Sequence, residues 1–359
     1  MKKKFGMGGA LLMLATAGVS VLVAGSATAS SAKHTASTQV CVLLPDTKSS
    51  VRWVQFDAPD FAKALKAAGV TYSINNALGD AQKQKAQAQA CIAAGATVVV
   101  ETALDNGSAA AIEKLFTSHG GKAIDYDRQV TGGSASVYVT FDGKAVGEAQ
   151  ANGIIAAMKA NGTYKASSVV AELWGGPTDQ NAFWFKSGND AVLNPLFASK
   201  AVTKGPQQFV PDWLATNAGP IFSQMLVKTN NNIQAAIAAN DGIAGAVVAQ
   251  EQAKKLKPIP LSGQDATVQG VQYIISGWQT GTVYKYVPDE ANAAAAAAVA
   301  LLKGTTPKTN TTRLNGKVKE PTLALPVVWI TKANYTRLFT DKFLKKTDVC
   351  VGTYAQYCK

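Results

Sequence analysis

Polar side chains follow short apolar segments at six places in this chain of 359 residues. Each segment has the length and composition of a buried strand. Because ligands of open α/β sheets bind outside the carboxyl ends of the strands, the residues that follow are candidates for binding. The six groups are Arg52 with Trp53, Asp127 with Arg128, Asp179 with Asn181, Asn240, Asp265 and Lys285.

The chemistry of these side chains suits a sugar. Carboxylates accept hydrogen bonds, Arg and Lys donate them, and Asn amides do both, so a row of hydroxyl groups would find both kinds of partner. The C–H faces of a pyranose ring are apolar and can lie against an aromatic ring. Trp53, Phe183 and Trp213 are the candidates for that contact.

A purely structural interpretation stays open at each position. Asp179 or Asp241 could cap the helix that follows, because strand-end Asp residues commonly do so. Arg128 could pair with a neighbouring carboxylate on the surface, and Trp53 could belong to the core. Six such groups at the same edge of the sheets favour the binding interpretation.

Other kinds of site have less support. The sequence has no Walker pattern, and Gly175–Gly176 is too short to indicate phosphate binding. The four cysteines and the two histidines, His34 and His119, fit no zinc spacing. The formal charge is +12, but the lysines are scattered, which indicates a solvated surface rather than nucleic-acid binding. We therefore expect no metal, cofactor or nucleic acid.

Strands and helices alternate along the chain. This alternation predicts parallel sheets with helices on both faces, and the number of segments favours two doubly wound domains over one. Strands are expected at 39–44, 70–74, 96–101, 122–126, 168–173, 235–240, 258–263 and 281–286. Helices are expected at 80–94, 143–160, 215–228 and 288–303.

The N-terminus has the features of a secretory signal peptide. Three lysines precede an apolar stretch from Phe5 to Gly25, and Ala27-Thr28-Ala29 resembles a signal-peptidase site. We expect a signal peptide over 1–29, a flexible segment over 30–38, and export across the inner membrane to the periplasm or cell envelope. An uncleaved membrane anchor is the alternative. An oxidising compartment favours disulfides among the four cysteines.

An ordered set of motifs resembles a known family. LLPDTKSSVRW, DYDR, WGGPTDQNAFWF, AAND, SGQDA and TVYK are similar to segments of the periplasmic sugar-binding proteins of bacterial ABC importers, nearest the xylose-binding and multiple-sugar-binding branch. The resemblance covers about residues 39–340. It implies ligand contacts from Arg52, Trp53, Asp127, Arg128, Asp179, Asn181, Trp213, Asn240, Asp265 and Lys285.

The resemblance also implies a type I periplasmic binding protein fold, with two Rossmann-like domains joined by three hinge crossings. We expect one domain over 39–140 and 286–322 and the other over 141–285 and 323–348, followed by a cysteine-containing tail over 349–359. In a sheet of strand order 2-1-3, the helix that bears Cys91 passes over the first strand, which bears Cys41. We therefore expect disulfides Cys41–Cys91 and Cys350–Cys358, with buried free thiols as the alternative for the first pair.

The expected function is capture of a monosaccharide such as xylose, glucose or galactose. A monomer would close around the sugar and deliver it to the membrane permease of an ABC importer, without catalysis. A sugar-sensing role beside a chemosensory receptor is an alternative. A carbohydrate-active hydrolase using Asp127, Asp179 and Asp265 is less favoured, because the set contains no Glu, no catalytic His and no cofactor motif.

Overall fold

The computed structural model describes residues 37–358. The predicted signal peptide, and the predicted flexible segment up to residue 36, lie outside the described residues. Within residues 37–358, none of the helices combines the length and the apolar character needed to cross a bilayer.

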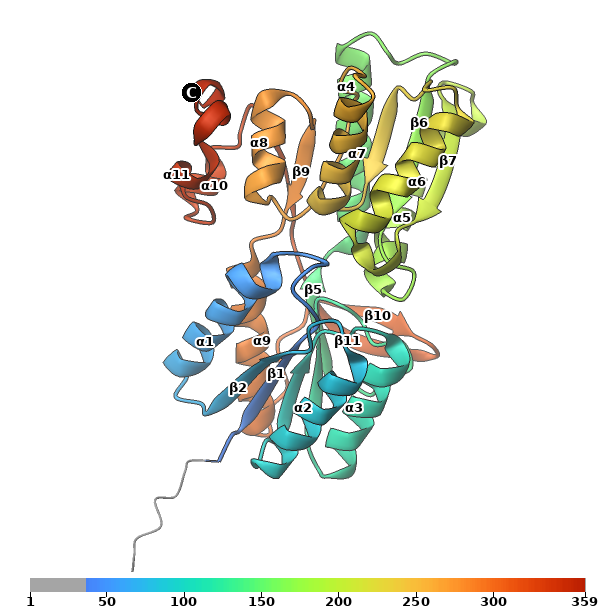
Figure 1. Ribbon diagram of the computed structural model, residues 1–359. Coiled ribbons are helices and arrows are strands. Elements are labelled where there is room, and N and C mark those ends of the chain that lie inside the picture. Colours follow the sequence, from blue (N-terminus) through green and yellow to red (C-terminus); the bar gives the residue numbers. More distant parts are fainter. Residues whose placement is uncertain (1–36, 359) are drawn as a thin grey trace, which may run out of the picture. The chain divides into compact units, whose positions relative to one another are not determined.

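Three sheets organise the described residues. The first has seven strands in the order β10-β11-β5-β4-β3-β1-β2, of which only the edge strand β10 is antiparallel to its neighbour (Figure 1). The strands are β1 (Val40–Leu44), β2 (Tyr72–Asn76), β3 (Val98–Glu101), β4 (Lys122–Tyr126), β5 (Val137–Phe141), β10 (Thr311–Asn315) and β11 (Val318–Leu325).

Helices cover both faces of this sheet. Side chains of β1 alternate between them: Val40 and Val42 join one apolar cluster, and Cys41 and Leu43 join the other. A strand covered on both sides must be apolar throughout, and every residue of β1 is buried. The helices are α1 (Ala58–Ala67) and α9 (Val287–Leu302) on one face, and α2 (Ala81–Ala93) and α3 (Asn106–Ser118) on the other. We call this half, residues 40–141 and 287–325, the first lobe.

The second lobe, residues 143–284 and 328–358, is built around a parallel group of strands in the order β7-β6-β8 and an antiparallel pair β9-β12. The strands are β6 (Val169–Trp174), β7 (Thr203–Phe209), β8 (Ala235–Ala238), β9 (Gly281–Tyr284) and β12 (Val328–Thr331). Its helices are α4 (Gly143–Ala160), α5 (Gln180–Ala198), α6 (Ala215–Lys228), α7 (Asp241–Ala253), α8 (Val268–Ser276), α10 (Arg337–Thr340) and α11 (Lys346–Val349). Each lobe therefore has a parallel sheet flanked by helices, as the sequence predicted, and the second lobe adds the antiparallel pair.

The strand predicted at 258–263 is wrong as a regular strand. Leu261 pairs with Ala236 of β8, and Gln264 pairs with Val283 of β9, but each is an isolated bridge. Pro258 and Pro260 have no N–H to donate to a ladder, so the segment lies in a strand position without forming one.

Three short segments connect the two lobes. They follow β5 at Asp142, β9 at Lys285–Tyr286 and β11 at Pro326–Val327. The expected domain boundaries, and the movement of the two lobes as separate domains, stay predictions.

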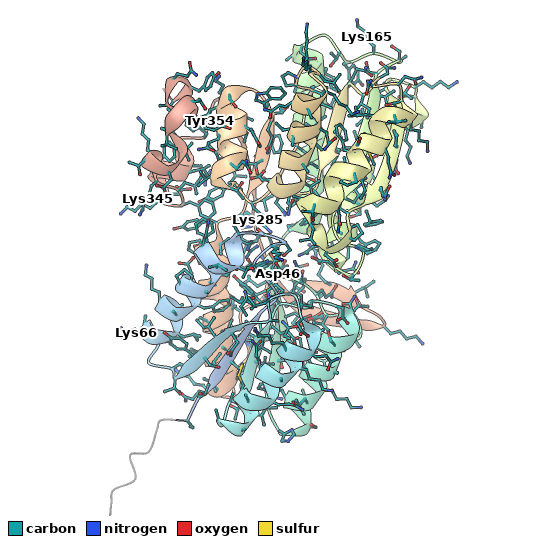
Figure 2. All side chains as sticks on the ribbon, in the orientation of Figure 1. Asp46, Lys66, Lys165, Lys285, Lys345 and Tyr354 are labelled. Atoms are coloured by element: carbon teal, nitrogen blue, oxygen red, sulfur yellow. A yellow bond between two sulfur atoms is a disulfide. The ribbon has the colours of Figure 1, made fainter. Side chains whose placement is uncertain are left out.

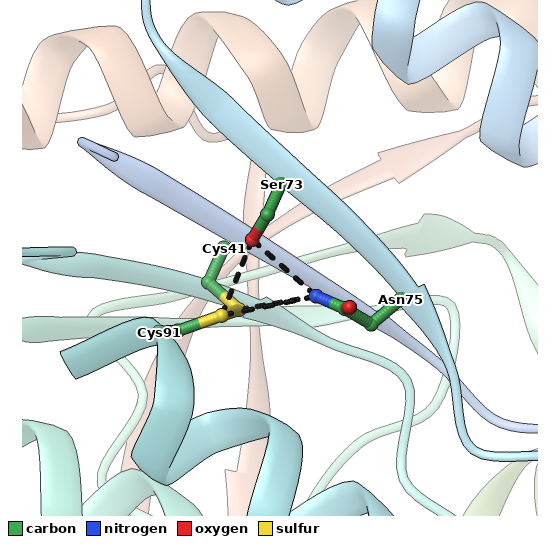
Figure 3. The surroundings of a disulfide bond; sticks show 4 residues. All are labelled: Cys41, Ser73, Asn75 and Cys91. Carbon is green, nitrogen blue, oxygen red and sulfur yellow. Dashed lines mark hydrogen bonds between the residues drawn. A yellow bond between two sulfur atoms is a disulfide. The ribbon is translucent and has the colours of Figure 1, made fainter. Parts of the chain in front are cut away.

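Both expected disulfides, Cys41–Cys91 and Cys350–Cys358, are present. Cys41 of β1 is bonded to Cys91 of α2, with Ser73 Oγ at 3.2 Å from the Cys91 sulfur (Figure 3). The second bond joins Cys350 and Cys358 in the C-terminal tail. This tail packs against α8, where Cys350, Tyr354 (labelled in Figure 2) and Cys358 contact an apolar cluster that contains Val271 and Ile275.

Candidate ligand-binding site

One pocket between the lobes is lined by all ten residues that the sequence indicated. Four further side chains complete its wall: Ser49, Ser50, Phe185 and Gln264. The side chains contact one another closely and leave a cavity of about 20 Å³, which is about the room that one water molecule needs. The predicted set is therefore a spatial cluster, although its members come from seven separate places in the sequence.

The loops after the strands position this cluster. In the first lobe, Asp127 and Arg128 follow β4 directly, and Arg52 and Trp53 lie beyond β1 in a helical turn. In the second lobe most of the remaining groups follow β6, β7, β8 and β9, with Lys285 (labelled in Figure 2) directly after β9, and Asp265 follows the irregular segment 258–263. Parallel strands present their carboxyl ends at one edge of a sheet, and this brings distant residues together.

Two of the pocket carboxylates lie on strained backbone. Asp127 has φ of 59° and Asp265 has φ of 92°, a region that side-chain-bearing residues rarely adopt. A backbone hydrogen bond holds each one: Asp127 N–H donates to Val139 O and Asp265 N–H to Val283 O, both at 2.9 Å. Such strain persists where surrounding structure fixes it, and it is concentrated at functional sites.

The guanidinium of Arg52 is buried among three carboxylates. Its Nε and Nη2 donate to Asp57 at 3.0 and 2.7 Å, its Nη2 to Glu290 at 2.5 Å, and its Nη1 to Asp127 at 2.6 Å. Burial lowers the pKa of Arg52, but the three carboxylates outweigh it and hold the pKa above its ordinary value. Most of the donors are thus used inside the first lobe, and Arg52 serves to orient Asp127 in the pocket wall.

Asp127 receives hydrogen bonds from both lobes. Besides Arg52, its carboxylate accepts from Lys285 Nζ at 3.4 Å and Asn181 Nδ2 at 3.1 Å. Burial raises the pKa of Asp127, but Lys285 and the two neighbouring guanidinium groups lower it by more, and the resulting pKa is about 2. The carboxylate therefore stays ionised at neutral pH and can accept from a ligand hydroxyl.

An ion pair between Arg128 and Asp179 joins the lobes. Arg128 Nε lies 2.9 Å from Asp179 Oδ2, which also accepts from Trp213 Nε1 at 3.1 Å. The other guanidinium nitrogens donate to Ala103 O at 3.0 Å and to Ser49 Oγ at 3.3 Å. Burial raises the pKa of Asp179, and Arg128 opposes that rise.

Helix capping and pocket lining turn out to coexist. Asp179 Oδ1 accepts from Asn181 N–H at 2.9 Å and caps α5, while its Oδ2 meets Arg128. Asn240, rather than Asp241, caps α7 by accepting from Ile243 N–H at 2.9 Å. The capping interpretation is thus correct for Asp179 and wrong for Asp241, and the remaining polar atoms of Asp179 and Asn240 contact the other lobe.

Further hydrogen bonds cross between the lobes around the pocket. Asn181 Nδ2 donates to Asp127 O at 2.8 Å, and Asn240 Nδ2 donates to Ser49 O at 3.1 Å. Ser50 Oγ donates to Asp265 Oδ2 at 2.9 Å. The polar groups of the pocket therefore meet one another where a polar ligand would meet them.

Two tryptophans supply the aromatic surface. Trp53 is buried, its Nε1 donates to Ser49 Oγ at 3.0 Å, and the guanidinium carbon of Arg52 lies 4.6 Å from its ring centroid. Trp213 lies over Gly175, where any Cβ would collide with the indole ring. The Gly175–Gly176 pair thus makes room for an aromatic side chain, which agrees with setting aside a phosphate loop.

The prediction of Phe183 as an aromatic residue of the pocket is wrong. Its side chain is 41% exposed and lines no part of the pocket, whereas Phe185 does. Phe185 lies four residues after Asn181 on α5, so these two residues share one face of the helix. Phe183, two residues after Asn181, lies on a different face. The helical spacing from Asn181 was the signal that could have identified Phe185.

No metal centre accompanies this pocket in the described part of the chain. Among residues 37–358, no group of three or more His, Cys, Asp or Glu side chains has an arrangement that could hold a metal ion. The cations that neutralise the pocket carboxylates are instead the side chains of Arg52, Arg128 and Lys285.

Comparison with known proteins places this geometry in context. The sequence model of the periplasmic binding protein domain matches residues 40–306. The chain is 31% identical over 320 residues to the D-xylose-binding periplasmic protein of Escherichia coli, covering 89% of this chain and 94% of that one. It is 30% identical to the multiple sugar-binding periplasmic receptor ChvE of Rhizobium radiobacter, covering 84% and 89%.

A solved structure shares the arrangement of elements. The carbohydrate transporter solute-binding protein of Chloroflexus aurantiacus, in complex with D-glucose, superposes with a TM-score of 0.79 at 29% identity. The superposition covers 87% of this chain and 98% of that one.

Proposed function

The chain belongs to the periplasmic binding protein family, and from that premise we propose that it is an exported solute-binding protein for a monosaccharide. The sugar would lie in the pocket between the two lobes and pass from there to the membrane permease of an ABC importer. The relatives named for D-xylose and multiple sugars, and the glucose complex, support an aldose as the ligand. The protein would act as a monomer.

The observation that carries this proposal is the make-up of the pocket wall. Carboxylates, guanidinium and ammonium groups and amides lie beside two tryptophans, all buried and all within one cluster. Vicinal hydroxyls need acceptors and donors in alternation, and a pyranose ring needs a flat apolar surface. The pocket offers both.

The mechanism follows from how the lobes touch. A cavity of about 20 Å³ cannot admit a pyranose, so the lobes must part before a sugar enters. The groups that now pair across the lobes, such as Arg128 with Asp179, would then bind the sugar from both sides. A ligand that contacts both lobes binds the closed arrangement better than the open one and shifts the population towards it.

Hydrolysis is the less supported reading of the three pocket carboxylates. A general acid must hold a proton near neutral pH, but the cations around Asp127 keep its pKa at about 2. Asp265 and Asp179 are also paired with cations, Lys285 and Arg128. Ion-paired carboxylates suit the binding of hydroxyl groups, and we propose that no bond is broken here.

Calorimetric titration with an aldose panel tests the proposal. D-xylose, D-glucose, D-galactose and L-arabinose would each be titrated into the purified protein, with the acyclic alcohol D-mannitol as the control. We expect one-to-one binding of at least one aldose and none of mannitol. Absence of binding throughout the panel, or release of nitrophenol from nitrophenyl glycosides, would contradict a monosaccharide-binding protein.

A further inference from the structure

A second, larger pocket adjoins the first. It has a volume of about 230 Å³ and shares Ser49, Arg128, Asp179 and Trp213 with the central pocket. The Arg128–Asp179 ion pair therefore forms part of a common wall between them. We call this space the side pocket.

Three leucines from three different loops line the side pocket. Leu78 follows β2, Leu104 follows β3, and Leu214 precedes α6. Leu78 is 59% exposed and has φ of 58°, a left-handed conformation that disfavours a branched apolar side chain. A turn of this kind is usually built from Gly, Asn or Asp, so turn geometry gives no reason for a leucine here. Its apolar surface is available to a ligand.

The buried polar atoms of the side pocket are already engaged. The carboxylate of Asp46 (labelled in Figure 2) accepts from Lys48 N–H at 2.7 Å and from both the N–H and the hydroxyl of Ser49 at 2.6 Å. Trp213 Nε1 donates to Asp179. The other polar side chains that line it, Lys48, Thr178 and Asp212, are exposed, so hydrogen bonds from a second sugar unit to them would only replace hydrogen bonds to water and contribute little. An apolar group needs no such partners.

We propose that the protein binds glycosides, with the sugar in the central pocket and an aryl or alkyl aglycone in the side pocket. This inference rests on the proposed function of the central pocket. An apolar cavity of about 150 Å³ can hold benzene, so the side pocket has room for a phenyl group. The aglycone would contact Leu78, Leu104 and Leu214, next to the common wall.

Matched glycosides of one sugar test the inference. The methyl and phenyl glycosides of D-glucose and D-xylose, in both anomers, would be titrated calorimetrically beside the free sugars and cellobiose. We expect one phenyl glycoside to bind at least tenfold more tightly than its methyl counterpart. Equal affinity of the methyl and phenyl glycosides, or cellobiose binding as tightly as the phenyl glycoside, would overturn the aglycone assignment.

Two leucine variants sharpen the test. Leu78→Asp should remove the gain from the phenyl group and leave the affinity for the free sugar unchanged. Leu314→Asp is the matched control, because Leu314 is 63% exposed on β10 and lines neither pocket. A phenyl gain that survives Leu78→Asp would overturn the inference while the sugar site stands. Failure of the free sugars and of every glycoside to bind would overturn the proposed function as well.

Discussion

Replacing Arg128 by alanine removes a cation of the central pocket that forms an ion pair between the two lobes. The change deletes the 2.9 Å contact with Asp179 and the hydrogen bonds to Ala103 O and Ser49 Oγ. Asp179 keeps two donors, Trp213 Nε1 and the Asn181 N–H, so its carboxylate is not left bare. The variant is therefore expected to fold.

The size of the effect depends on what Arg128 contacts when a sugar is bound. A hydrogen bond from a guanidinium to a sugar hydroxyl involves a charged group and contributes roughly 1.5–3 kcal/mol. Its loss weakens binding by about ten- to a hundredfold. If Arg128 serves only as the partner of Asp179, the loss falls on stability and the affinity is unchanged.

Calorimetry on the folded variant separates these outcomes. The sugar found in the aldose panel would be titrated into Arg128→Ala, and circular dichroism would check its fold. Arg337→Ala is the matched control, since Arg337 pairs with Asp341 at 3.2 Å on a half-exposed helix outside the central pocket. An unchanged affinity in Arg128→Ala, with an intact spectrum, would refute the site assignment and leave only the fold.

Three further predictions concern stability and the pocket wall. Burial raises the pKa of Glu251 and Glu290 to about 8 and that of Asp241 to about 7, so the protonated forms of these groups contribute stability that is present below pH 4 and lost as the pH rises towards 8. Thermal unfolding should therefore give a lower Tm at pH 8 than at pH 5, with a smaller difference in Glu251→Gln. An equal Tm at both pH values would contradict this. Replacing Cys41 and Cys91 together by alanine opens a loop of 50 residues and should lower the free energy of unfolding by roughly 2–4 kcal/mol in a urea titration. The same change at Cys350 and Cys358, which are 8 residues apart, should lower it by less. Gly175→Ala should displace Trp213 and weaken sugar binding about tenfold or more, whereas Gly219→Ala, with its nearest neighbour at 3.5 Å, should not; equal affinities in the two variants would argue against a role for Trp213.

The sequence predicted which residues gather around the central pocket better than it predicted the strands. Residues such as Asp127 and Lys285 follow strongly apolar segments, and the edge of a parallel sheet collects whatever follows its strands. The Cys41–Cys91 pair could be predicted for the same reason, because the sheet order alone brings α2 over β1. Local pattern and topology were enough in these cases.

The features that were missed depend on tertiary packing. The strand β7 has the sequence TKGPQQF, which is polar and contains Pro206, and it forms because it can pair along one edge of β6. The tail after residue 348 carries no strong helical pattern, yet it packs on α8 through its disulfide and Tyr354. Neither outcome can be read from a local period, since the stabilising partner is distant in the sequence.

The most direct test of the central claim is a crystal structure of the protein with the monosaccharide that binds most tightly. We expect one sugar in the central pocket, with hydrogen bonds to Asp127 and Arg128 from the first lobe and to Asn240 or Asp265 from the second. Trp53 or Trp213 should lie against a ring face. A sugar bound elsewhere, or one held by a single lobe, would contradict the proposed binding site.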